Sequence, residues 1–140
     1  MSHISKIEIV ITSLDNLIRA CTRLGFQFNA GQTKYRWYGR VIDPDRYPLP
    51  DGITEDQLGQ CEHAISVPEA EYEIGVVKRD GKYLLLCDFW DSKLKNRIGD
   101  GGGRLKQAYA IEKTLQAARL KNYRVTEQRV SSGVRLILSA

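Results

Sequence analysis

The first stretch of the chain, residues 3–11, carries an isoleucine at every second position towards its end. Ile7, Ile9 and Ile11 follow this spacing, with Glu8 between the first two. A period of two among β-branched residues is typical of a strand with one buried face. The sequence therefore predicts that the chain opens with a strand.

Directly afterwards the spacing of apolar residues changes to three and four. Ser13 precedes this stretch as a candidate N-cap, and Gly25 follows it as a candidate C-terminal glycine. The spacing predicts an amphipathic helix whose apolar stripe consists of Leu14, Leu17, Ile18, Cys21 and Leu24. Phe26 and Phe28 then begin a second predicted strand, and residues 33–42 are predicted to form a third.

The middle of the chain lacks such a period. Residues 43–70 hold all four prolines and an Asp51-Gly52 turn signal. Residues 54–57 are expected to start a short helical turn. We interpret this segment as a crossover loop, and loops of this length in compact domains are often functional.

The last part of the chain returns to regular patterns. Strands are predicted at 71–77 and 82–89, joined by an Asp80-Gly81 turn, and a linker follows at 91–103. A second amphipathic helix is predicted from the stripe Leu105, Ala108, Ile111, Leu115 and Ala118, and a closing hairpin from residues 123–130 and 134–138.

Taken together, these elements read as two similar β-α-β-β halves, 1–42 and 71–140, on either side of the crossover loop. Both helices end in similar sequences, at 20–26 and 117–123. This similarity fits either an old duplication or independent convergence of two helix-to-strand connections. We expect an α+β fold: a mainly antiparallel sheet with two helices on one face.

Composition places few further limits on this fold. The 140 residues fit one domain, 1–140, and the net charge of +4 is a mild bias toward anionic partners. The three cysteines are widely spaced, and no signal peptide or apolar run of about 18 residues is recognisable. We expect a cytoplasmic protein, or one in a plastid stroma or host-cell cytosol, without a membrane partner.

The most specific local feature is a glycine-rich loop that leads into the second helix. Gly101, Gly102 and Gly103 are flanked by Arg97 and followed by Arg104 and Lys106. Free N–H groups and the dipole at a helix start favour an anion, and glycines allow a ligand to approach the backbone. The spacing matches neither of the common phosphate-binding glycine motifs, so a plain flexible turn is the alternative.

A second candidate is the stretch 34–40, which interleaves basic and aromatic residues. Arg36 and Trp37 are the residues in it that we expect to contact a ligand, by pairing with phosphate and stacking on a base. Aromatic residues on a strand also serve as core or cross-strand partners, which is the alternative interpretation. Nucleic acid itself is not expected as the partner.

No arrangement in the sequence predicts catalysis, a metal site or a cofactor. Cys61 and His63 lack the further ligands that a zinc site needs, and nothing orients them as a nucleophilic pair. Acidic residues occur at the end of one predicted strand, Asp88 and Asp91, and along another, where we expect a solvated edge: Glu69, Glu71 and Glu73.

Several short sequence motifs follow one another along the chain, at residues 1–4, 72–75, 83–90, 105–110 and 123–125. In this respect the sequence resembles the uncharacterised family of the hypothetical chloroplast reading frame thirty-five protein, found in plastids, cyanobacteria, other bacteria and phages. The resemblance implies an α+β fold. It implies no activity.

Two functions from different classes remain open. The first is non-enzymatic binding of a small anionic ligand such as a nucleotide, for example to sequester it as a phage protein would. The second is a protein-interaction or assembly module that forms homo-oligomers or binds a protein partner.

Overall fold

The structure is a computed structural model that describes residues 4–140. His3, the first residue of the predicted opening strand, lies outside the described residues. The strands and helices in chain order are β1 (Ile4–Ile11), α1 (Leu14–Leu24), β2 (Gln27–Ala30), β3 (His63–Ser66), β4 (Ile74–Arg79), β5 (Lys82–Asp88), α2 (Ser92–Ile98), α3 (Gly103–Leu120), β6 (Arg124–Val130) and β7 (Gly133–Ser139).

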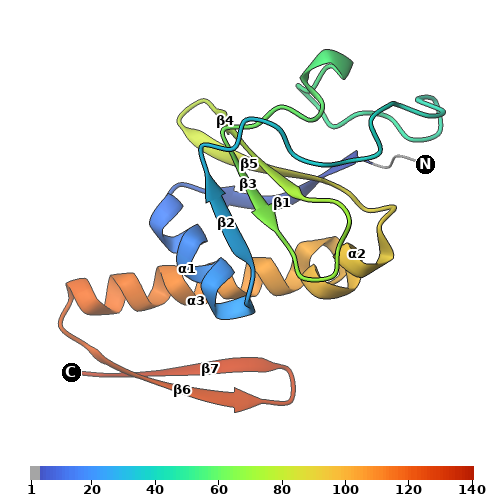
Figure 1. Cartoon of the computed structure of the whole chain (residues 1–140). Helices are drawn as coiled ribbons and strands as arrows, with labels where there is room; N and C mark the ends of the chain where they lie inside the picture. The colour runs from blue at the N-terminus through green and yellow to red at the C-terminus, as the bar shows by residue number, and fades with distance from the viewer. Residues whose placement is uncertain (1–3) are drawn as a thin grey trace.

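Five strands form one antiparallel sheet in the order β1-β5-β4-β3-β2 (Figure 1). The helices α1 and α3 pack against each other and cover one face of this sheet (Figure 1). The predicted α+β class, with a mainly antiparallel sheet and helices on one face, is confirmed.

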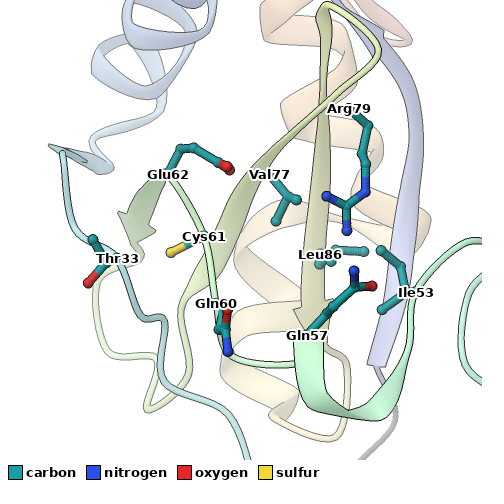
Figure 2. Close-up of a pocket in the computed structure, with 9 residues that line it drawn as sticks. All are labelled: Thr33, Ile53, Gln57, Gln60, Cys61, Glu62, Val77, Arg79 and Leu86. Carbon is teal, nitrogen blue, oxygen red and sulfur yellow. The ribbon is translucent and has the colours of Figure 1, made fainter.

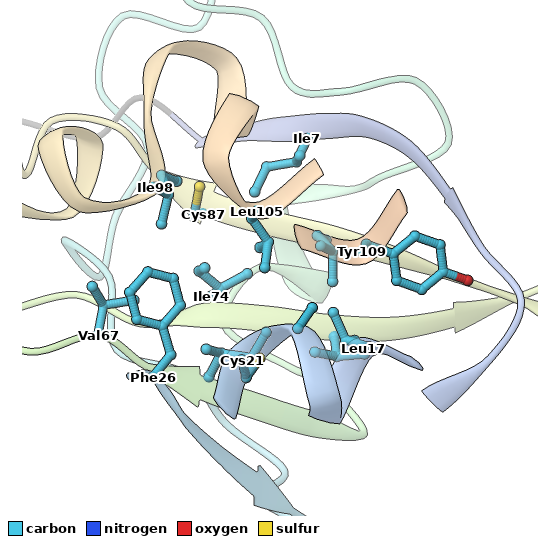
Figure 3. Packing of buried hydrophobic residues seen from close by; sticks show 14 of the residues in the cluster. Ile7, Leu17, Cys21, Phe26, Val67, Ile74, Cys87, Ile98, Leu105 and Tyr109 are labelled. Atoms are coloured by element: carbon cyan, nitrogen blue, oxygen red, sulfur yellow. The ribbon is translucent and has the colours of Figure 1, made fainter. Parts of the chain in front are cut away.

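The face covered by the helices holds the larger core. Leu17 of α1, Leu105 of α3 and Ile74 of β4 are each fully buried there (Figure 3). Tyr109 of α3 joins them, and its hydroxyl accepts hydrogen bonds from the backbone N–H groups of Thr12 and Ser13, at 3.1 and 3.3 Å. The turn between β1 and α1 is thereby fixed to α3.

The predicted N-cap and C-terminal glycine of the first helix are confirmed. The Ser13 side chain accepts a hydrogen bond from the Asn16 N–H, and Gly25 closes the helix in the left-handed conformation. One stripe residue was predicted wrongly: Ile18 is 37 % exposed. The buried face of α1 passes instead through Asn16, Leu17, Ala20 and Cys21, because the helix packs on the sheet and on α3 only along that side.

The opposite face of the sheet is covered by irregular chain. A second core there joins Tyr35, Ile53 and Leu58 of the segment 33–62 to sheet residues such as Leu86. Gly75 of β4 makes this packing possible, because a Cβ at that position would lie 2.3 Å from the Tyr35 ring. The sheet is therefore buried on both faces, by helices on one and by a loop on the other.

The predicted strand at 33–42 is wrong. Within that segment only Lys34 forms a β-bridge, with Gln60. The alternating pattern arises because Tyr35 packs on the sheet while the Arg36 backbone N–H bonds to the buried Glu73 carboxylate, at 2.9 Å.

The missing strand lies inside the predicted crossover loop 43–70. It is β3, which pairs through all four residues with β2 on one side and through three of them with β4 on the other. The expected helical turn at 54–57 is present as a 3₁₀ turn, Glu55–Gln57. The strand expected from residue 71 begins only at Ile74, because the preceding residues bond to Asp91 and Arg36 instead.

The predicted linker 91–103 also contains regular structure. Asp91 caps α2 by accepting hydrogen bonds from Lys93 and Leu94 N–H, and Leu94 and Ile98 are buried on one side of this short helix. A 3₁₀ turn, Asp100–Gly102, connects it to α3. In α3 the predicted stripe is buried except for Leu115, which is half-buried.

The closing hairpin, β6 and β7, forms a two-stranded sheet of its own. Figure 1 shows it alongside α3, away from the five-stranded sheet. With β3 counted as its last strand, the first half has the order strand, helix, strand, strand, whereas the segment from Lys82 onward has the order strand, two helices, strand, strand. The two halves also differ in space, because β2 and β3 join the main sheet and β6 and β7 do not.

Candidate functional site

The predicted glycine loop is a close-packed turn between α2 and α3. Gly102 has φ +78° and lies against β1, where a Cβ would be 2.7 Å from an Ile7 methyl group. The Gly102 N–H donates to the Gly99 carbonyl and the Gly103 N–H to the Asp100 carbonyl. Two donors that were expected to face an anion are therefore occupied by the turn itself.

The cations around this loop point to different places. Arg97 forms an ion pair with Glu69 at 3.1 Å. Lys106 is half-buried on α3. Only Arg104, on the first turn of α3, lines a large cleft.

The other predicted pair, Arg36 and Trp37, lies in the segment that covers the opposite face of the sheet. Arg36 bonds to the Glu71 carbonyl and lies 3.6 Å from the Glu73 carboxylate. The Trp37 ring packs on Gly59, where a Cβ would lie 2.6 Å from the indole nitrogen. The structure thus does not bring the predicted site residues together in one site.

The cleft that contains Arg104 lies between the helices and the hairpin, and we call it the hairpin cleft. Its volume is about 720 Å³, within the range of small-molecule sites. Its lining combines arginines, one glutamate, one glutamine and small or apolar residues: Arg23, Leu24, Arg104, Gln107, Ala108, Ile111, Glu127, Arg129, Val130, Ser131, Gly133 and Val134.

The charges of the hairpin cleft are unequal. Arg23 of α1 donates to Glu127 at 2.7 Å and to Glu112 at 3.0 Å. These hydrogen bonds raise the pKa of Arg23, and the same contact lowers the pKa of Glu127. Arg23 is thus balanced by two carboxylates, and it ties α1 to α3 and to the hairpin.

The two other arginines of the cleft are not balanced in this way. The side chains of Arg104 and Arg129 have no hydrogen-bond or ion-pair partner within residues 4–140. The hairpin cleft therefore carries excess positive charge, contributed from both of its walls.

A second, smaller pocket lies between the segment 33–62 and the sheet, and we call it the loop pocket (Figure 2). Its volume is about 260 Å³, and its residues are Thr33, Ile53, Gln57, Gln60, Cys61, Glu62, Val77, Arg79 and Leu86. The Cys61 thiol donates to the Gln32 carbonyl, and burial raises its pKa to about 11. A thiol in that state is not an activated nucleophile.

The buried carboxylates bond to backbone and thereby fasten loops. Asp88 accepts from the N–H groups of Tyr38 and Trp90, at 3.3 and 3.0 Å. Glu73 is only 2 % exposed, so the expected solvated edge is wrong at this residue. It accepts from Gln32 and Ser66 side chains as well as from Arg36.

Arg23, Gln107 and Arg129 were not recognised as site residues from the sequence. They reach the hairpin cleft only because the hairpin folds back along α3, which no local pattern indicates. Arg79 was missed in the same way, since the loop that faces it was interpreted as a strand and a crossover.

No family model, curated protein or solved structure matches the chain. The resemblance to the chloroplast reading frame family stays a prediction. Within residues 4–140 no three His, Cys, Asp or Glu residues are grouped to hold a metal ion, and no helix there has the length and apolar character needed to span a bilayer.

Proposed function

We propose that the chain binds a small anionic ligand in the hairpin cleft without transforming it. The observation that carries this proposal is the placement of Arg104 and Arg129 on opposite walls of one cleft, with no carboxylate partner for either in the part of the chain that is described. Guanidinium groups bind phosphate and carboxylate through paired N–H donors.

The rest of the cleft lining favours a ligand that carries polar and apolar groups in addition to its anionic group. The Gln107 side chain adds an amide, and Ile111 and Val134 offer apolar surface. A volume of about 720 Å³ fits a nucleotide or a similar phosphorylated molecule. A nucleotide is therefore the ligand class that we test first.

The choice of binding over catalysis rests on the acidic groups and thiols described above. The carboxylates Glu73, Asp88 and Asp91 are used by backbone hydrogen bonds, and the thiol of Cys61 is held in its protonated form. The charged side chains that line the hairpin cleft are arginines, apart from Glu127, which already pairs with Arg23.

Isothermal titration with inorganic pyrophosphate, AMP and ATP tests the proposal. Binding is expected for at least one of them, and Arg104→Gln or Arg129→Gln should each weaken it about tenfold or more, since a charge-assisted hydrogen bond contributes about 1.5–3 kcal/mol. No heat with any of the three ligands would refute the proposal.

Arg135→Gln is the matched control. Arg135 lies on β7, and the alternation of side chains puts it on the face of the hairpin opposite to Arg129. It removes the same charge and should leave the affinity unchanged. An equal loss in all three variants would show that only overall charge matters, which would contradict a defined site.

The exposed apolar residues near the C-terminus favour a second candidate, self-association through the hairpin. Leu120 is 80 % exposed, and Tyr123, Ile137 and Leu138 are each more than 40 % exposed. An isolated two-stranded hairpin is marginally stable alone, so a partner surface would stabilise it. Light scattering should then show a dimer that Ile137→Asp converts to monomer, whereas a monomeric native chain would exclude this candidate.

A further inference from the structure

The loop pocket is built by chain that is fixed in place at several points. Tyr35 packs on Gly75 and Trp37 on Gly59, while the buried Glu73 and Asp88 carboxylates hold the backbone N–H groups of Arg36 and Tyr38. An irregular loop that is anchored in this way presents its pocket in a defined shape without a ligand, which lowers the cost of binding.

The loop pocket contains one positive and one negative side chain. Arg79 of β4 points into it from one side, and Glu62 lies on the other (Figure 2). Arg79 has no carboxylate partner among the described residues, and its side chain donates only to the Lys78 carbonyl, at 3.5 Å. The Glu62 carboxylate uses one oxygen, Oε2, for the Lys78 N–H at 2.8 Å.

The Gln57 amide and an apolar floor complete the loop pocket. The side-chain oxygen of Gln57 accepts from the Thr54 N–H, so the N–H groups of the Gln57 side-chain amide remain available. Gln57 and Arg79 point toward one another over Leu86 in Figure 2. The floor consists of Ile53, Val77 and Leu86, each buried.

Size and charge together select the ligand. A volume of about 260 Å³ lies below the range of about 300–1,000 Å³ for drug-sized molecules, which favours a ligand smaller than a nucleotide. The opposite charges of Arg79 and Glu62 on the two sides of the pocket favour a ligand that carries both signs over a simple anion. The apolar floor requires an apolar part.

We propose that the loop pocket binds a free α-amino acid with an aliphatic side chain. Arg79 and the Gln57 amide bind its carboxylate, Glu62 accepts from its ammonium group, and its side chain lies on Ile53, Val77 and Leu86. This site lies on the other side of the sheet from the hairpin cleft, and it does not depend on the function proposed there.

Isothermal titration with L-leucine and two analogues tests this proposal from the ligand side. 4-Methylpentanoate lacks the ammonium group, and 3-methylbutylamine lacks the carboxylate. L-Leucine should bind, and each analogue should bind at least about tenfold more weakly, the loss of one charged contact. No heat with L-leucine, or equal binding of either analogue, would overturn the proposal even if no variant were made.

Variants of the chain test it from the protein side. Arg79→Gln and Glu62→Gln should each weaken L-leucine binding about tenfold or more. Lys82→Gln, at the cross-strand partner of Arg79 but outside the pocket, is the control and should bind normally. Arg104→Gln should also bind L-leucine normally, and a loss in that variant would assign the amino acid to the hairpin cleft and overturn the proposal.

Discussion

The two faces of the five-stranded sheet are buried by different means. Helices cover one face with a continuous core in which Leu17, Leu105 and Ile74 are fully buried. The segment 33–62 covers the other face with a smaller core and holds its backbone through buried carboxylates. One face thus depends on apolar area, whereas the other depends on a few polar contacts and on glycines that let aromatic rings approach.

The two covers also border cavities of different charge. The hairpin cleft lies at the border of the helix cover, and the loop pocket lies beneath the loop. The hairpin cleft carries excess positive charge, while the loop pocket carries one charge of each sign.

The largest effect is expected from truncation in the helix-covered core. Leu105→Ala should lower the free energy of unfolding by about 2–5 kcal/mol, because a fully buried leucine leaves a cavity that helices cannot fill. Leu58→Ala, in the loop-covered core, should cost less because that core is smaller and Leu58 keeps 7 % of its surface exposed. Urea denaturation measures both, and an equal or greater cost for Leu58→Ala would contradict the distinction between the faces.

A smaller, local effect is expected at the carboxylate that anchors the loop. Glu73→Gln keeps the shape but removes the charge that accepts from Arg36, Gln32 and Ser66, which should cost about 1–3 kcal/mol. Hydrogen exchange at the Arg36 amide should accelerate while that in α3 stays slow. Glu71→Gln is the control, since its side chain is exposed, and it should leave exchange unchanged.

Adjacent glycines of the turn before α3 should differ in their response to alanine. Gly102→Ala puts a Cβ against Ile7 at a positive φ and should cost about 1–3 kcal/mol. Gly103→Ala has open space and φ −56°, so it should be neutral or stabilise by up to about 1 kcal/mol. Thermal unfolding measures both, and equal destabilisation would show that the triplet serves flexibility instead of packing.

The smallest effect concerns acid stability. Burial alone would raise the pKa of Asp91, but hydrogen bonds from the N–H groups of Tyr72, Leu94, Glu71 and Lys93 hold it below its usual value. Its contribution is therefore present above the unfolded-state pKa of about 3.9 and is lost as the pH falls through the lower folded-state pKa.

Asp91→Asn should accordingly make the unfolding free energy fall less steeply below about pH 4. Asp45→Asn, on the exposed part of the loop, is the control and should keep the native pH dependence. An unchanged slope for Asp91→Asn would mean that this carboxylate does not couple folding to protonation.

The sequence predicted the helix-covered face better than the loop-covered face, for a physical reason. Periodic burial against a helix or sheet produces periodic sequence, so α1, α3 and most strands were predictable. The short helix α2 also had a usable signal, because Asp91 is a capping residue and Leu94 and Ile98 are four residues apart.

The loop-covered face has no such period. Tyr35 and Trp37 alternate as strand residues do, but each packs against a distant glycine, Gly75 and Gly59. Likewise, Arg129 lies 25 positions after Arg104 in the chain, and the two line one cleft only because the hairpin folds back along α3. Contacts of this kind are set by tertiary structure and leave no mark on local spacing.

We propose that the hairpin cleft is the anion site. Titration of the ¹⁵N-labelled chain with pyrophosphate, followed by backbone and arginine side-chain NMR signals, tests it most directly. We predict that the shifted signals cluster at Arg104, Gln107, Arg129 and the hairpin turn, with residues 33–62 unaffected. Shifts centred on Arg79 and the loop pocket, or no saturable shifts at all, would contradict the account.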